Sequence, residues 1–188
     1  SVVAAVGGDP VTALATGAAA AWASHSSIAV LLVVASLAAS DVLSAEAGLL
    51  LVLGINLGAG VPALIGTLGL PAAARRLPLT NLACRAFLAL LLAPFASTLA
   101  EALPVLALPG PAAAIAGAHI AFNLALVTAL SPFSRPIMAA AHRLLPDRPQ
   151  PFDPFLAPRY LDPAALDTPA MALSNAATEA ARMSEVLD

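Results

Sequence analysis

The feature that most constrains this chain is a series of long apolar segments that are interrupted by polar residues and helix breakers. Of its 188 residues, 60% are hydrophobic and 10% are charged, and the mean hydropathy is +0.91. Soluble domains are typically about 45–50% apolar and about 25% charged. The sequence therefore predicts an integral membrane protein built from helices, since helices satisfy their own backbone hydrogen bonds in lipid.

Four hydrophobic blocks precede a polar tail. The blocks are residues 11–40, 47–70, 79–100 and 112–131. The first is about thirty residues long, whereas one crossing of a bilayer needs roughly twenty. The polar tripeptide His25-Ser26-Ser27 lies at its midpoint. We expect two half-length helices that meet there as a re-entrant hairpin; a single tilted helix with a polar centre is the alternative.

The second block is interrupted around Asn56. Gly54, Gly58, Gly60 and Pro62 fall within it, which predicts a broken helix. Backbone groups freed at a break cost several kcal/mol in hydrocarbon, so a break indicates a site lined by protein or water. Alternatively, Gly54 and Gly58 form a helix-packing face.

The charged residues predict which way the blocks cross. Acidic residues share one side of the predicted layout: Asp9, Asp41, Glu46 and Glu101. Arginines share the other: Arg75, Arg76, Arg135, Arg143 and Arg148. Because cytoplasmic loops carry the arginine excess, we expect the arginine side and the C-terminal tail in the cytoplasm of a multi-pass inner-membrane protein. The hairpin then enters from outside.

Several functional classes find no support. The net charge of -3 is too small to imply a nucleic-acid partner, and one cysteine, Cys84, excludes an internal disulfide and a multi-cysteine metal site. No catalytic motif is present, so we predict that the chain is not an enzyme. An intramembrane hydrolase that uses Ser26 or Ser27 with His119 is conceivable, but nothing in the sequence fixes that geometry.

The predicted breaks offer groups for an anion and a cation. The N–H groups of Ser26, Ser27 and Ile28 at the start of a half-helix can cradle an oxyanion, and Asn56 can add an amide. Simpler roles stay open: the hydroxyls can bond back to the preceding turn. His119 and Asn123 can form a structural pair, and Arg85 can extend to the cytoplasmic interface.

Five segments in order resemble the bacterial type II sodium/phosphate cotransporters. The family's hairpin signature G-A-x-x-T-A-x-x-Q-S-S-S-A is similar to 17–29, and its G-A-N-I-G-T-T to 54–60. Three further matches are Ala74-Arg75-Arg76 with Asn81 and Arg85, His119 to Asn123 with Pro132, and a tail that starts at Pro158. Polar family residues are replaced at Ala21, His25, Ile28 and Ala59-Gly60.

The resemblance implies an all-α transporter half with sodium-coupled symport of inorganic phosphate. A degenerate membrane anchor for a regulatory domain, or transport of another oxyanion, is the alternative. The implied binding residues are His25, Ser26, Ser27, Gly54, Asn56 and Gly58, with sodium near Ser26, Ser27 and Asn56. The resemblance implies no cofactor, with sodium as the coupling ion. Phosphate, the bilayer and a missing N-terminal repeat would be the partners.

The implied domains are a transporter repeat (1–132), a proline-rich linker (133–163) and the start of a PhoU-like cytoplasmic helical region (164–188). The last has an apolar stripe at three- and four-residue steps, from Leu166 to Met183. Such a stripe predicts an amphipathic helix that packs on a partner.

Overall fold

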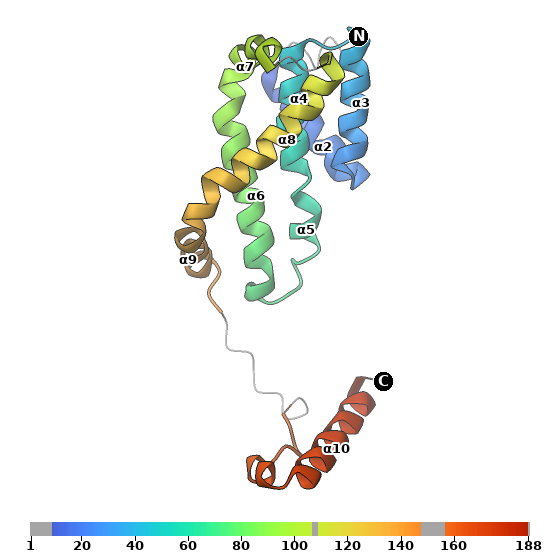
Figure 1. The fold of residues 1–188 in the computed structure, drawn as a ribbon, viewed down its shortest axis with the longest axis vertical. Coiled ribbons are helices and arrows are strands. Elements are labelled where there is room, and N and C mark those ends of the chain that lie inside the picture. The colour runs from blue at the N-terminus through green and yellow to red at the C-terminus, as the bar shows by residue number, and fades with distance from the viewer. Residues whose placement is uncertain (1–8, 107–108, 148–156, 188) are drawn as a thin grey trace. The chain divides into compact units, whose positions relative to one another are not determined.

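The computed structural model is helical in the parts of the chain that it describes, residues 9–106, 109–147 and 157–187 (Figure 1). It divides into two compact units, residues 1–148 and 149–188. The helices of the first unit are α2 (Pro10–Ser24), α3 (Ser27–Ala39), α4 (Ala45–Gly58), α5 (Val61–Ile65), α6 (Ala72–Leu92), α7 (Ala96–Ala102), α8 (Pro111–Leu130) and α9 (Ser134–Leu144). The predicted all-helical fold is confirmed.

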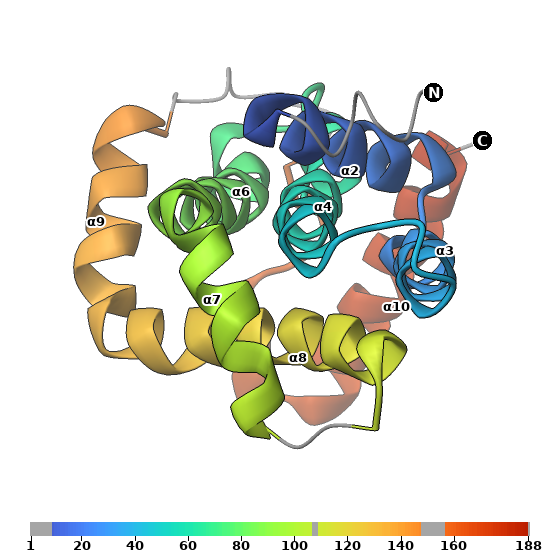
Figure 2. The same cartoon turned by 90° about the horizontal axis from the view of Figure 1, so that it is seen from above.

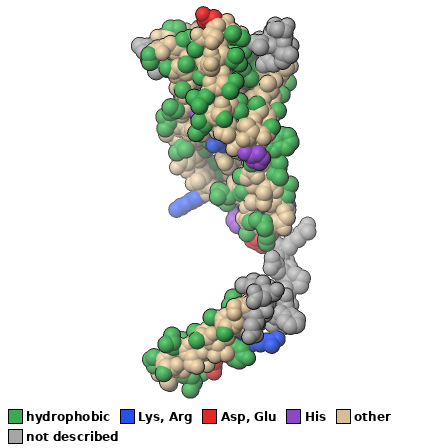
Figure 3. Space-filling view, turned by 90° about the vertical axis from the view of Figure 1, so that its right-hand side faces the viewer, with side chains coloured by type: hydrophobic (Ala, Val, Ile, Leu, Met, Phe, Trp, Pro, Cys, Tyr) green, Lys and Arg blue, Asp and Glu red, His purple; other side chains and the backbone are tan. Residues whose placement is uncertain are grey.

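Three helical stretches are long and apolar enough to cross a membrane. They are Ala45–Ile65, Ala72–Ala102 and Pro111–Leu144. Apolar side chains are spread along the sides of the first unit, while acidic side chains appear at its ends (Figure 3). The chain is therefore a membrane protein, as its composition predicts.

The first hydrophobic block folds as two helices, α2 and α3, joined by a sharp turn. His25 ends α2 in a left-handed conformation (φ 51°). Ser26 caps α3, because its hydroxyl accepts a hydrogen bond of 3.2 Å from the Ala29 N–H. Left-handed residues are common at helix ends and serine at helix starts. The alternative of one tilted helix across this block is wrong.

α4 lies at the centre of the first unit, as the view from above shows (Figure 2). All its residues from 47 to 56 are buried. α2 runs beside it in the same direction, with Leu14 against Gly54 and Ala18 against Gly58. A Cβ atom at either glycine would collide with the opposing carbonyl oxygen. These two glycines therefore permit close helix packing, the alternative that the sequence left open.

The interruption of the second block lies after these glycines, at Ala59-Gly60. There the Gly60 N–H donates to the Leu57 carbonyl at 3.1 Å, three residues back. The short helix α5 follows with Pro62 in its first turn, where a proline costs no helical hydrogen bond. The second block is thus a broken helix, and its break lies just beyond Asn56, among the predicted breakers Gly58, Gly60 and Pro62.

α6 begins before the expected third block and contains Pro78. A proline inside a helix removes one hydrogen bond without always ending the helix. Short 3₁₀ turns, η1 (Ala93–Phe95) and η3 (Ser131–Phe133), connect α6 to α7 and α8 to α9.

α9 lies inside the stretch 133–163 that the sequence predicts as a linker, which corrects that boundary. Pro136 falls in the first turn of α9, where it starts a helix instead of preventing one. Arg76 of α6 holds the far end of α9: its guanidinium donates to the Leu145 carbonyl at 3.0 and 2.8 Å and lies 2.7 Å from the Asp147 carboxylate.

The second unit consists of η4 (Pro163–Asp167) and α10 (Pro169–Leu187) with the segment before them. Glu179 on α10 is 5% exposed and accepts hydrogen bonds of 2.9 Å from the N–H groups of Arg159 and Tyr160. The Arg182 guanidinium binds the same carboxylate. Arg182 also donates to the Ala157 carbonyl at 3.1 Å, so both side chains fasten the preceding segment to the helix.

Candidate functional site

Four polar residues from three apolar helices meet inside the first unit. We call them the Arg85 cluster: Asn56 of α4, Arg85 of α6, and His119 and Asn123 of α8. Polar groups within membrane helices are costly and usually face a protein interior or a path for a solute.

Arg85 is the centre of the cluster. Its Nη1 donates to the Asn56 backbone carbonyl at 3.1 Å and lies 3.5 Å from Asn56 Oδ1. Its Nη2 donates to Asn123 Oδ1 at 3.2 Å, and its Nε to Asn81 Oδ1 at 3.1 Å. All these acceptors are neutral. Among the described residues, no carboxylate forms an ion pair with Arg85.

Two amides complete the links between α4 and α8. Asn123 Nδ2 donates to Asn56 Oδ1 at 2.9 Å and to the His119 carbonyl at 2.8 Å. Asn56 is fully buried, and its own Nδ2 donates to the Val52 carbonyl at 2.9 Å. The amides thus fix the position of the guanidinium.

The helix break explains why Arg85 lies here. In an uninterrupted helix the Asn56 carbonyl would accept from the Gly60 N–H, which instead bonds the Leu57 carbonyl. Arg85 takes the released carbonyl, and a cation is favourable at the C-terminal end of a helix. The expectation that Arg85 extends to the interface is therefore wrong.

The hairpin tip forms a second polar region. The His25 side chain is exposed, and Ser26 and Ser27 are half-buried. The tip bonds locally: the Ser24 hydroxyl donates to the Ser26 carbonyl at 3.2 Å. Figure 1 shows the turn about level with the break between α4 and α5. Within the described residues, no hydrogen bond joins the tip to the Arg85 cluster.

The predicted site residues thus occupy three kinds of position. His25, Ser26 and Ser27 lie at the hairpin tip and Asn56 lies in the Arg85 cluster, while Gly54 and Gly58 pack on α2. Whether they bind a solute stays a prediction.

Sequence reasoning missed Arg85 and Asn123 as partners of Asn56. The expected His119–Asn123 pair is realised only through the His119 backbone carbonyl. The His119 Nδ1 is buried and has no hydrogen-bond partner among the described atoms. The sequence did hold one sign of this contact: Asn56, Arg85 and Asn123 are each a polar residue within an apolar block.

Comparison with known proteins identifies relatives that are named for inorganic phosphate export. Over 187 residues, all of this chain, it is 36% identical to a protein of Escherichia coli O157:H7 named "Putative inorganic phosphate export protein YjbB". Proteins of that name from Escherichia coli K12 and Salmonella typhimurium are 35% identical over the same length. The chain spans 34% of each of these relatives. No family model and no solved structure matches the chain.

These names correct the expected direction of transport. They describe export of phosphate, so the expected sodium-coupled symport is wrong, and they give no better support to another oxyanion. The relatives are named as transport proteins, which agrees with the prediction that the chain is not an enzyme. The chain is a membrane-protein segment that is similar, along its whole length, to about one third of proteins named for inorganic phosphate export.

Proposed function

We propose that the chain forms part of a membrane protein that carries inorganic phosphate out of the cell. The observation that carries this proposal is Arg85, a guanidinium among apolar helices whose acceptors among the described residues are all neutral oxygens. A charge removed from water is unfavourable unless it is paired. A phosphate ion is a suitable partner, because its oxygens match the fork of N–H groups on arginine.

The hairpin tip would supply the remaining contacts to phosphate. It presents the N-terminus of α3, where the first N–H groups have no partner within the helix and the helix dipole is positive. The half-buried hydroxyls of Ser26 and Ser27 and the exposed imidazole of His25 lie at the same turn. Asn56 would act indirectly, by holding Arg85 in position.

We place the hairpin in the membrane as a re-entrant element. α2 and α3 contain 15 and 13 residues, fewer than the roughly twenty that cross a bilayer. Both outer ends of the hairpin return to the end where α4 begins. Asp41 and Glu46 lie at that end, which we assign to the outside of the cell.

The opposite end would face the cytoplasm. It carries Arg75, Arg76 and Arg143, and Arg76 joins the start of α6 to the end of α9. Arg148, grouped with them by the sequence, lies outside the described residues. A basic entrance raises the local concentration of an anion, which suits an exporter that takes phosphate from the cell interior.

The rest of a longer protein would complete the path. Since the chain spans about a third of its relatives, we propose that a second, inverted repeat faces this one, with phosphate bound between them. The second unit would belong to a cytoplasmic helical region.

Release of radiolabelled phosphate from proteoliposomes that contain the intact protein tests this function. We expect Arg85→Gln to slow release about tenfold or more, because hydrogen bonds to charged groups contribute about 1.5–3 kcal/mol. Arg135→Gln, which removes an exposed arginine outside the proposed entrance, is the matched control. Release no faster than from protein-free vesicles would refute the function. Release unchanged by Arg85→Gln in folded protein would refute the site.

A further inference from the structure

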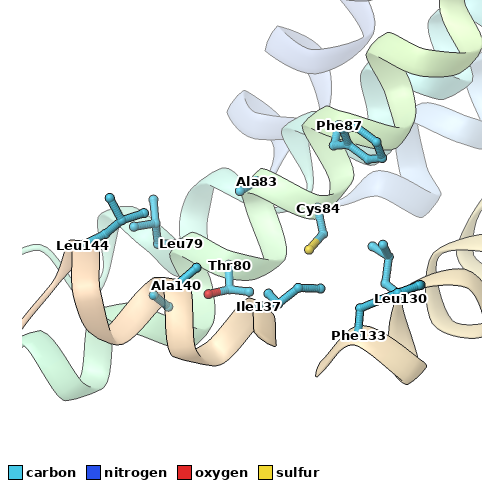
Figure 4. Close-up of a pocket in the computed structure, with 11 residues that line it drawn as sticks. Leu79, Thr80, Ala83, Cys84, Phe87, Leu130, Phe133, Ile137, Ala140 and Leu144 are labelled. Carbon is cyan, nitrogen blue, oxygen red and sulfur yellow. The ribbon is translucent and has the colours of Figure 1, made fainter. Parts of the chain in front are cut away.

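Two cavities of the first unit offer an anion little. A groove of about 420 Å³ between α6 and α9 is lined by apolar side chains apart from Thr80 and Cys84 (Figure 4). The Thr80 hydroxyl already donates to the Arg76 carbonyl at 2.7 Å. A cavity of about 300 Å³, bordered by α4, α6, α7 and α8, is lined by apolar side chains and Gly117. We therefore look for further partners of phosphate within the Arg85 cluster itself.

His119 is the member of the Arg85 cluster whose side chain the proposed function does not yet use. It stands four residues before Asn123 and four after Ile115, so the three side chains lie on one face of α8. That face points inward: Ile115 is 1% exposed and packs against α4, and Asn123 bonds Arg85. The His119 ring is also close enough to Arg85 for the charge of the guanidinium to act on it.

The Nδ1 atom of His119 is buried and has no hydrogen-bond partner among the described atoms. Buried polar groups are almost always hydrogen-bonded, so this nitrogen indicates a partner that the described residues do not supply. In a neutral imidazole with its hydrogen on Nε2, Nδ1 is an acceptor. The partner that completes the site is then a hydrogen-bond donor.

Phosphate can be such a donor, whereas sulfate cannot. At neutral pH inorganic phosphate retains at least one proton, so one of its oxygens is a hydroxyl, while sulfate has lost both protons. A guanidinium does not distinguish the two ions, because it only donates hydrogen bonds. Side chains four residues apart on a helix are about 5–6 Å apart at Cβ, so an ion held by Arg85 beside Asn123 lies about one turn from His119.

We propose that Nδ1 of neutral His119 accepts a hydrogen bond from the hydroxyl of phosphate while Arg85 binds its unprotonated oxygens, which makes the site selective for phosphate over sulfate. This inference rests on the proposed phosphate site at Arg85. A site built to bond a hydroxyl rejects an analogue that lacks one, because the buried acceptor is then left unpaired. Arsenate, which is protonated like phosphate, should be accepted.

Competition for phosphate binding tests this selectivity. Radiolabelled phosphate is bound to the purified intact protein and displaced with unlabelled phosphate, arsenate or sulfate. Arsenate should compete about as well as phosphate, and sulfate at least about tenfold more weakly. His119→Leu should weaken phosphate and arsenate about tenfold without weakening sulfate. His119→Asn is the matched control, because its amide oxygen is attached to Cγ, as Nδ1 is in histidine, and should restore much of the selectivity.

The ratio of phosphate to sulfate affinity does not depend on the fraction of folded protein. A ratio that His119→Leu leaves unchanged would overturn the inference, and so would a ratio that is lost equally in both variants at position 119. Arg85→Gln should weaken all three anions alike. If it does and the His119 variants keep the ratio, the site at Arg85 stands and this inference alone falls. If Arg85→Gln changes none of the affinities, the site and the inference fall together.

Discussion

Gly58 lies so close to Ala18 that a Cβ atom at position 58 would be 2.9 Å from the Ala18 Cα. Both contact surfaces are backbone, so neither can move aside as a side chain would. We predict that Gly58→Ala destabilises the protein by about 1–3 kcal/mol, the usual cost of overpacking, in spite of alanine's better helix propensity. Thermal unfolding in detergent measures the loss.

Gly69→Ala is the control for this substitution, because a Cβ atom at Gly69 would have no atom within 4 Å. Its unfolding temperature should stay at or slightly above that of the original protein. Equal unfolding temperatures for the two variants would show that α2 and α4 do not pack as described.

The Asn56–Asn123 hydrogen bond, 2.9 Å long, should contribute to the stability of the fold together with Arg85, because both amides also bond its guanidinium. Asn56→Leu leaves Asn123 and the guanidinium short of partners inside the protein. We expect Asn56→Leu and Asn123→Leu each to lower the free energy of unfolding by about 1–3 kcal/mol. A double-mutant cycle should give a coupling energy of about 0.5–3 kcal/mol, and additive effects would contradict the cluster.

Substitution of Arg76 should destabilise the protein more than substitution of its ion-pair partner Asp147. The Asp147 side chain is 69% exposed and that of Arg76 is 5% exposed. Asp147→Asn should therefore cost less than about 1 kcal/mol, as exposed ion pairs do. Arg76→Gln also removes both donors from the Leu145 carbonyl and should release the end of α9. Faster hydrogen exchange over residues 140–145 in Arg76→Gln, and not in Asp147→Asn, is the expected result.

Acid should loosen the second unit through Glu179. Hydrogen bonds from Arg182 and from the Tyr160 and Arg159 N–H groups lower the pKa of Glu179 from 4.5 to about 2. Since the folded-state pKa is depressed, the stabilisation is complete above about pH 4.5 and is lost as the pH falls toward 2. Exchange protection of the Arg159 and Tyr160 amides, normalised to the denatured chain, should fall across this interval.

Glu179→Gln is the matched variant, because glutamine has a similar shape but does not titrate. Its protection should be low at every pH and should show no step between pH 4.5 and 2. A step that persists in this variant would assign the acid sensitivity to another carboxyl group.

The turn at His25-Ser26 could be predicted from the sequence because it depends on local residues. The polar tripeptide supplies both the end of α2 and the cap of α3. The role of the glycines in α4 could not be decided in this way. A glycine pair has the same local pattern in a broken helix and in a packed one, and the deciding contacts come from Leu14 and Ala18, about forty positions away.

The position of Arg85 also depended on distant residues. Its partners Asn56 and Asn123 stand 29 and 38 positions from it in the sequence. An arginine near the end of an apolar segment usually extends toward water. The inward orientation of Arg85 is favourable because the break at Gly60 releases the Asn56 carbonyl. The composition of the block did not show the exact site of that break.

The backbone contact of α2 with α4 restricts how this protein can change shape. Gly17 completes the contact from the α2 side, where a Cβ atom would meet the Leu51 carbonyl. A small slide of one helix along the other would bring side chains opposite backbone, so the hairpin and α4 should move together as a rigid body. Any opening and closing during the proposed phosphate release would then occur across α6 and α8, where side chains instead of close backbone contacts make the connection.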